Sequence, residues 1–163
     1  MQHVDVAMYY LRKKKKAGLL RHSFTIMSTV FFKYLRDSYT QFNASQDPGV
    51  FLKKKLKKCV VDHITGESGA EQLVDPWDGV DDVFIPVIDG GHWYLLVVNV
   101  RSRCITVYDS MSSTSGHQTL VDTEAGNLAT ILPYVLHVAG VLLSNEEIFK
   151  VVHYDQMPQQ DNG

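Results

Sequence analysis

The sequence predicts a single α+β domain in which helices flank a central, mostly antiparallel sheet. Helical spacing of apolar residues dominates positions 1–63, whereas short apolar strands around a chain reversal follow between 82 and 109. The chain has 163 residues, 45% hydrophobic and 21% charged, which is enough to bury one core but not two. No linker or internal repeat divides it, so one domain is expected over 1–163.

The N-terminal part is expected to form two helices. The first covers residues 4–16, where apolar residues recur every three or four positions and five basic residues at the end suit the helix dipole. Gly18 is expected to end it. The second runs from residue 24 to about 35 and carries no charge before Lys33, which predicts that it is buried.

A third helix is expected from about residue 50 to 63, after the turn at 47–49. It contains five lysines within 53–58. Such a run is consistent with a nuclear-import or phosphate-binding patch. More often, such a run is only the solvated face of a helix whose other side is apolar, and the sequence leaves both interpretations open.

Short strands follow. Residues 82–88 form an apolar strand in which Pro86 indicates an edge or irregular position. Residues 92–98 and 105–109 are two apolar runs separated by the polar reversal at 101–103, which is typical of a hairpin. Because these strands are apolar almost throughout, we expect helices on both faces of the sheet.

The C-terminal third is expected to contain one helix and one strand. A Ser-rich loop at 110–116 precedes a helix from about 122 to 132, which can continue past Pro133. A last strand is expected at 148–154, followed by a polar tail.

Cysteine content and charge exclude several classes of protein. Cys59 and Cys104 alone provide neither a disulfide framework nor a cysteine-rich metal cluster, which favours a reducing compartment. No secretory signal is visible, and the longest weakly polar stretch, 128–143, is shorter than the roughly 20 residues of a membrane span. We therefore expect a soluble protein without a membrane partner. The net charge of −2 is the sum of +10 in residues 1–60 and −12 in the remainder. This asymmetry is consistent with an acidic partner at the basic end, or with two solvated faces of opposite charge.

The hairpin brings two ionisable residues together. If the reversal is centred on Val100 and Arg101, His92 faces Asp109 across the two strands. Facing side chains have Cβ atoms about 4.5–5.5 Å apart, close enough for the carboxylate to fix the imidazole tautomer and leave the other nitrogen as a base. Gly90 and Gly91 just before His92 leave this edge open for a substrate backbone. An incidental pair capping the strand ends is the other interpretation.

A base requires a nucleophile, and none is obvious. Cys104 lies five residues from Asp109 along its strand, roughly 17 Å away at about 3.4 Å per residue. Cys59 belongs to a predicted helix without activating neighbours. Cys59 and His63 share a helix face, but without further ligands we expect no metal site.

Residues 83–98, 105–111 and 157–163 together resemble the ubiquitin-like-protein-specific (SUMO-type) cysteine peptidases, including their plant and transposon-associated relatives. His-Trp at 92–93, Tyr-Asp-Ser at 108–110 and Pro-Gln-Gln at 158–160 are specific only in combination, and they occur in the family's order. Residues 4–12 resemble the family's first helix. The resemblance implies a papain-like, adenain-like cysteine peptidase core.

The resemblance also implies roles for individual residues. His92 matches the general base, Asp109 the residue that orients it, and Gln160 the side chain of the oxyanion hole. Trp93 matches the aromatic residue that roofs the channel for the Gly-Gly tail of the substrate. No cofactor or metal is implied.

Two positions of the family pattern are absent. The family's nucleophile lies in an Asp-Cys-Gly motif that would place it three residues after Gly163, and a further Trp precedes the first helix. We therefore expect residues 1–163 to be a ubiquitin-like-protease catalytic domain truncated at both ends, and the chain as given to be inactive or nearly so.

The function implied by the resemblance is a cysteine peptidase or isopeptidase that cleaves after the C-terminal Gly-Gly of a SUMO-like modifier. Its partners would be that modifier and its conjugates, and its location the nucleus or otherwise the cytoplasm. A non-catalytic module that binds a ubiquitin-like protein remains the alternative. Nucleic-acid contact by the lysine-rich residues 12–16 and 53–58 is disfavoured, because few aromatic residues lie beside them.

Overall fold

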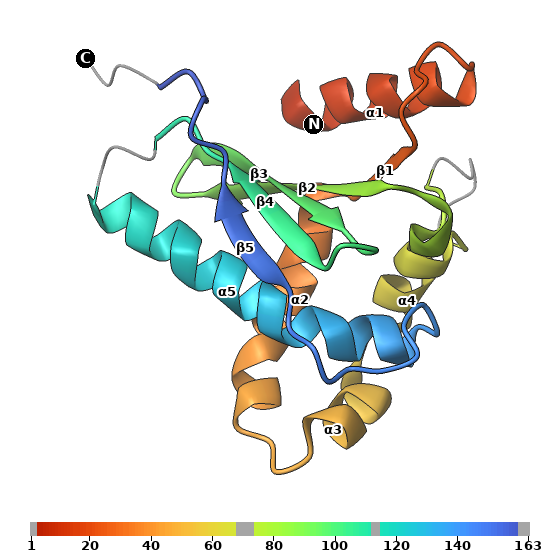
Figure 1. Cartoon of the computed structure of the whole chain (residues 1–163), viewed down its shortest axis with the longest axis vertical. Coiled ribbons are helices and arrows are strands. Elements are labelled where there is room, and N and C mark those ends of the chain that lie inside the picture. The colour runs from red at the N-terminus through yellow and green to blue at the C-terminus, as the bar shows by residue number, and fades with distance from the viewer. Residues whose placement is uncertain (1–2, 68–73, 112–114, 160–163) are drawn as a thin grey trace.

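The computed structural model describes residues 3–67, 74–111 and 115–159. Within them, helices pack against a five-stranded sheet, which confirms the predicted α+β fold (Figure 1). The helices are α1 (His3–Lys16), α2 (Thr29–Asn43), α3 (Pro48–Lys55), α4 (Lys58–Thr65) and α5 (Ser115–Val138). The strands are β1 (Phe24–Ile26), β2 (Asp82–Asp89), β3 (His92–Asn99), β4 (Cys104–Tyr108) and β5 (Lys150–His153).

The sheet has the order β1-β2-β3-β4-β5. Its central pairs, β2 with β3 and β3 with β4, are antiparallel and supply most of the paired residues. The two outer strands add in parallel, β1 to β2 and β5 to β4. The predicted hairpin is therefore the centre of the sheet.

The prediction of a helix from 24 to 35 is wrong at its start. Phe24, Thr25 and Ile26 form β1 and pair with residues 82–84 of β2, and α2 begins only at Thr29. The aromatic and β-branched residues of β1 suit a strand. The Phe24 ring stacks on Phe84 with a centroid distance of 5.0 Å, so the partner that decides this segment lies far away in the sequence.

The expected third helix is divided into α3 and α4. Leu56 between them is extended, with φ −61° and ψ 127°, and this breaks the helical course. At the start of α3 the Asp47 carboxylate accepts a hydrogen bond from the Val50 N–H at 3.0 Å, which caps the helix. Leu52 and Val60 are buried, whereas the lysines of this segment lie mostly on the surface.

One face of the sheet carries the core. Helices α2 and α5 pack below the sheet in Figure 1, whereas α1 lies above it beside β1. Helix α5 is longer than predicted and continues through Pro133. Its residues His117, Val121, Glu124 and Leu128 follow one another at spacings of three or four, which is one helical face.

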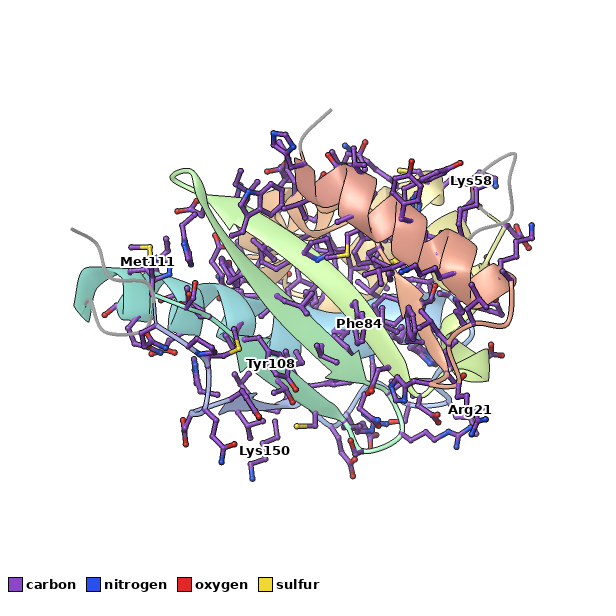
Figure 2. The ribbon with its side chains drawn as sticks, turned by 90° about the horizontal axis from the view of Figure 1, so that it is seen from above. Arg21, Lys58, Phe84, Tyr108, Met111 and Lys150 are labelled. Carbon is purple, nitrogen blue, oxygen red and sulfur yellow. The ribbon has the colours of Figure 1, made fainter. Side chains whose placement is uncertain are left out.

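The opposite face is covered less than expected. Phe84 and Tyr108 lie on it (Figure 2), and like Leu95 and Val97 they are only half-buried. In the described part of the chain α1 covers this face only near β1, where the Arg12 guanidinium donates to the carbonyls of Ile26 and Met27. Strand composition predicted apolar faces correctly but could not show what covers them.

The prediction for Pro86 is partly confirmed. Strand β2 is internal, but β1 pairs with it only as far as Phe84. Pro86 therefore pairs with Leu95 on one side and lies beyond the end of β1 on the other. A residue without an N–H fits at such a position.

Among the described helices, none is both long and apolar enough to cross a membrane.

Candidate active site

The register of β3 and β4 differs from the predicted one by two residues. Observed partners, such as Leu95 with Tyr108, have residue numbers that total 203, whereas His92 facing Asp109 required 201. The loop takes up the difference, because Asn99 pairs with Cys104 and leaves four residues in the turn. The Asn99 side chain fixes this turn by accepting the Ser102 N–H at 2.9 Å.

His92 and Asp109 nevertheless meet. A shift of two residues keeps every side chain on the same face of a strand. Asp109 therefore lies diagonally to His92, on the face that α5 covers, and His92 Nε2 is 2.8 Å from Asp109 Oδ1. The predicted contact is confirmed, and the predicted directly facing register is wrong.

Asp109 is among the most deeply buried charged residues described, with 5% of its surface exposed. Burial by itself raises the pKa of Asp109, but the Met111 N–H, which donates to Oδ1 at 2.9 Å, and the two neighbouring imidazoles outweigh it and lower that pKa. The carboxyl group is therefore ionised at neutral pH and can only accept hydrogen bonds. His92 must consequently donate from Nε2, which leaves Nδ1 without a proton in the neutral ring.

A second imidazole contacts the same carboxylate. His117, near the start of α5, has its Nε2 2.9 Å from Asp109 Oδ2. The rings of His92 and His117 meet edge to face, with centroids 4.8 Å apart and an interplanar angle of 90°. The site therefore contains a His-Asp-His unit rather than a pair.

A second polar cluster adjoins this unit. The buried Tyr94 hydroxyl donates to Glu124 Oε2 at 3.0 Å, and Arg36 donates to Oε1 at 3.0 Å. Arg36 also lies 3.5 Å from Asp89, at the turn before His92. Burial and then Glu124 raise the pKa of Tyr94, and the hydrogen bond to Glu124 raises that of Arg36.

The other predicted site residues are placed as follows. Trp93 lies on β3 beside Ile88 and is half-buried, and strand alternation turns it to the face opposite His92. Gln160 is outside the described residues. Its neighbour Gln159 donates from Nε2 to the Asp109 carbonyl at 3.4 Å, so the described chain reaches the site from its C-terminal side.

Neither cysteine of the sequence is beside His92. Cys104 pairs with Asn99 at the far end of β3, roughly 24 Å away at about 3.4 Å per residue. Cys59 packs against the core from α4, which lies near the beginning of β2 in Figure 1. The expectation that neither serves as the nucleophile agrees with these positions.

His92, Asp109 and His117 are also residue types that bind metals, and their ligand atoms lie within 4.8 Å of one another. Each imidazole, however, contacts its own carboxylate oxygen at 2.8 or 2.9 Å. Ligand atoms around a tetrahedral zinc ion are about 3.3 Å apart, given Zn–N distances of about 2.0–2.1 Å. The geometry fits a hydrogen-bonded unit better than a chelate.

His117 and Glu124 were not predicted from the sequence. The signal was present, because both continue the apolar spacing of Val121 and Leu128 and so belong to the buried face of α5. A polar residue in such a stripe requires a partner inside the protein.

His92 at the start of β3, bound to a buried Asp109 directly after β4, with helices packed behind the sheet, is an arrangement typical of the papain-like cysteine peptidase fold. The chain belongs to the Ulp1 protease family: the model of the family's C-terminal catalytic domain matches residues 1–163. Comparison with curated protein sequences gives no match.

Several solved structures are similar to this chain, and the first of them shows the same fold. A structure described as a de-sumoylating protease has a TM-score of 0.57 at 18% identity, over 97% of this chain and 53% of that one. The Chaetomium thermophilum Ulp1-like SUMO protease catalytic domain has a TM-score of 0.49 at 19% identity, over 96% and 52%. The C-terminal Ulp1 protease domain in complex with Smt3, the yeast ortholog of SUMO, has a TM-score of 0.37 at 20% identity, over 83% and 56%. The chain thus spans about half the length of these domains.

Proposed function

We propose that this chain is part of the catalytic domain of a cysteine peptidase that cleaves after the C-terminal Gly-Gly of a SUMO-like modifier. Membership of the Ulp1 protease family supports the reaction class. The observation that carries the proposal is the 2.8 Å contact between His92 Nε2 and the buried, ionised Asp109. It prepares Nδ1 of His92 to accept a proton.

In the proposed reaction Nδ1 of His92 takes the proton of a cysteine thiol, and the sulfur bonds to the carbonyl carbon of the terminal glycine. The C–N bond then breaks as the imidazolium gives its proton to the leaving nitrogen. Water hydrolyses the thioester, which releases the carboxylate and restores the thiol. Gln160, by the resemblance, would donate to the oxygen that becomes negative.

We propose that the sulfur comes from the Asp-Cys-Gly position of the family pattern, beyond Gly163. The distance of Cys104 from His92 and the packing of Cys59 support this. Residues 1–163 alone would then be inactive or nearly so, because a base without its nucleophile provides only slow residual hydrolysis.

The substrate proposal concerns the turn between β2 and β3. Gly90 and Gly91 have φ values of 54° and 88°, and neither has a heavy atom within 4 Å of the position that a Cβ would take. This open turn directly precedes His92. It leaves room for an extended substrate backbone beside His92, and by the resemblance Trp93 would roof the channel that admits a Gly-Gly tail without Cβ atoms.

The test uses an extended polypeptide, which continues residues 1–163 through the Asp-Cys-Gly motif and the helix after it. A SUMO-like probe that ends in Gly-Gly with an electrophile is expected to label it covalently. His92→Ala is expected to abolish labelling, whereas His3→Ala, at an exposed position of α1, is the matched control. Full labelling of His92→Ala would exclude His92 as the base.

The absence of a cysteine near His92 in the described residues also favours a second candidate, a non-catalytic module for a ubiquitin-like protein. Titration of the ¹⁵N-labelled 163-residue chain with an unmodified SUMO-like protein separates the two. Binding at the β2–β3 turn without labelling of the extended polypeptide would favour the module, and labelling would favour the peptidase.

A further inference from the structure

His117 is not among the site residues predicted from the sequence. Its side chain is 13% exposed, and that of His92 is 12% exposed, so both rings are largely shielded from water. The ring of His117 packs against the ring of His92 and also lies near that of Tyr94, whose centroid is 6.4 Å away. Its Nε2 has the Asp109 carboxylate within hydrogen-bond distance.

The two carboxylate oxygens of Asp109 have different donors. Oδ1 accepts from His92 and from the Met111 N–H, and Oδ2 accepts from His117. The side chain of Asp109 is only 2% exposed, so without His117 one oxygen of a buried charge would lose its partner. With His117 in place, the carboxylate is held at both ends and cannot rotate freely about its Cβ–Cγ bond.

Helix α5 sets this contact. His117 lies on the same helical face as Val121 and Glu124, of which Val121 is fully buried and Glu124 is bound to Tyr94. The helix is thereby fixed against β3 at a point seven residues after His117. The position of His117 therefore follows from core packing and not from a surface side chain that happens to reach the site.

We propose that His117 is a positioning residue for the catalytic pair. By donating from Nε2 to Oδ2, it turns Oδ1 of Asp109 toward His92 and keeps His92 in the tautomer with its proton on Nε2 and a free lone pair on Nδ1. The catalytic consequence rests on the proposed peptidase function, whereas the effect on the tautomer of His92 does not.

The structural half is tested on the unmodified 163-residue chain at pH 7. Long-range ¹H–¹⁵N spectra of the imidazoles distinguish the two neutral tautomers. Both His92 and His117 are expected to carry the proton on Nε2. A proton on Nδ1 of neutral His117 would overturn the proposal without the need for any variant.

Two substitutions then separate positioning from packing. His117→Leu keeps an apolar side chain of similar bulk but removes the donor, and His92 is expected to become a mixture of tautomers. His117→Gln retains a neutral N–H donor at a similar reach and is expected to restore the single tautomer. If the tautomer populations of His92 are the same in both variants, and circular dichroism shows that both remain folded, the proposal is wrong.

The catalytic consequence of the proposal is tested by measuring activity. In the extended polypeptide, His117→Leu is expected to lower kcat about 10-fold with KM unchanged, the scale on which residues that orient a functional histidine act. His117→Gln is expected to recover most of the loss. An effect on KM instead of kcat, or no recovery with Gln, would indicate a structural role only. If no variant has activity, the proposed function fails, but the tautomer result still stands or falls by itself.

A metal-binding role is the competing outcome. Zn²⁺ is added to the 163-residue chain and followed by calorimetry, with EDTA as the control. No stoichiometric binding is expected. Binding that His117→Gln abolishes would replace the hydrogen-bonded unit by a chelate and overturn the proposal.

Discussion

The two buried carboxylates of the described chain, Asp109 and Glu124, have similar exposure and very different partners. Asp109 is 5% exposed and Glu124 7%. Asp109 accepts from two imidazoles and a backbone N–H, whereas Glu124 accepts from Arg36 and Tyr94. The two clusters adjoin each other beneath β3 and are similarly buried. They therefore differ in the chemistry of their hydrogen-bond partners and not in exposure to water.

The partners decide what each carboxylate is suited to do. The pKa values of Arg36 and Tyr94 are both raised, so both groups stay protonated throughout the neutral range. Its hydrogen bonds from Arg36 on α2 and Tyr94 on β3 make Glu124 of α5 well suited to hold these three elements together. Imidazole is the side chain that ordinarily exchanges a proton near neutrality. The imidazoles of the Asp109 cluster are thus the groups suited to proton transfer, although the carboxylate between them is buried.

The largest expected effect comes from Asp109→Asn. Its amide allows the wrong tautomer of His92, and kcat/KM of the extended polypeptide is expected to fall about 10³–10⁴-fold, as for the equivalent change in a serine protease triad. Probe-labelling rates measure this. Asp122→Asn, half-exposed on α5, is the matched control. A loss of less than about 10-fold would show that Asp109 does not orient His92 for catalysis, and that its role differs less from that of Glu124 than their partners suggest.

Glu124→Ala is expected to have the largest effect on stability. It leaves the buried Tyr94 hydroxyl without an acceptor and Arg36 without its main partner, a loss of about 3 kcal/mol. Urea denaturation of the 163-residue chain measures it, with the exposed Glu146→Ala as control. A change below about 1 kcal/mol would contradict the structural role of this cluster.

Tyr94→Phe is expected to cost less, about 1 kcal/mol, because Glu124 keeps its bond to Arg36. The same denaturation experiment applies. Tyr10→Phe, at a position that is 61% exposed, is expected to change nothing. A cost equal to that of Glu124→Ala would mean that the phenol, and not the guanidinium, is the essential partner.

The smallest effect is a pH dependence. The pKa of Asp109 is lower in the folded chain than its unfolded value of about 3.9. Its contribution to stability is therefore complete above about pH 4 and is lost as the pH falls through the folded value. The difference in urea midpoint between the unmodified chain and Asp109→Asn is expected to stay constant between about pH 6 and pH 5 and to shrink as the pH falls below about 4. A difference that grows in this range would reverse the assigned direction.

Local pattern predicted most elements but not those that depend on distant partners. The hairpin, α1 and β2 follow from spacing within a few residues. β1 does not, because residues 24–26 become a strand only by pairing with residues 82–84. The break at Leu56 likewise depends on how two short helices pack, and periodicity continued across it.

The same distinction applies to the site. His92 and Asp109 could be paired from the sequence because alternation along strands determines which face each occupies. His117 and Glu124 come from a helix whose position over the sheet the sequence did not provide. Their helical spacing indicated burial, but their partners on β3 and directly after β4 became visible only in three dimensions.

The β3–β4 turn has a consequence for how this chain can change in length. The predicted and observed registers differ by two, an even number, and the pair at 92 and 109 survived the error. An odd offset would have carried the carboxylate through the sheet to the side of Tyr108. Residues gained or lost within 100–103 need not disturb the chemistry. Deleting one residue inside β4 is instead expected to exchange inner and outer side chains and to separate His92 from the carboxylate that orients it.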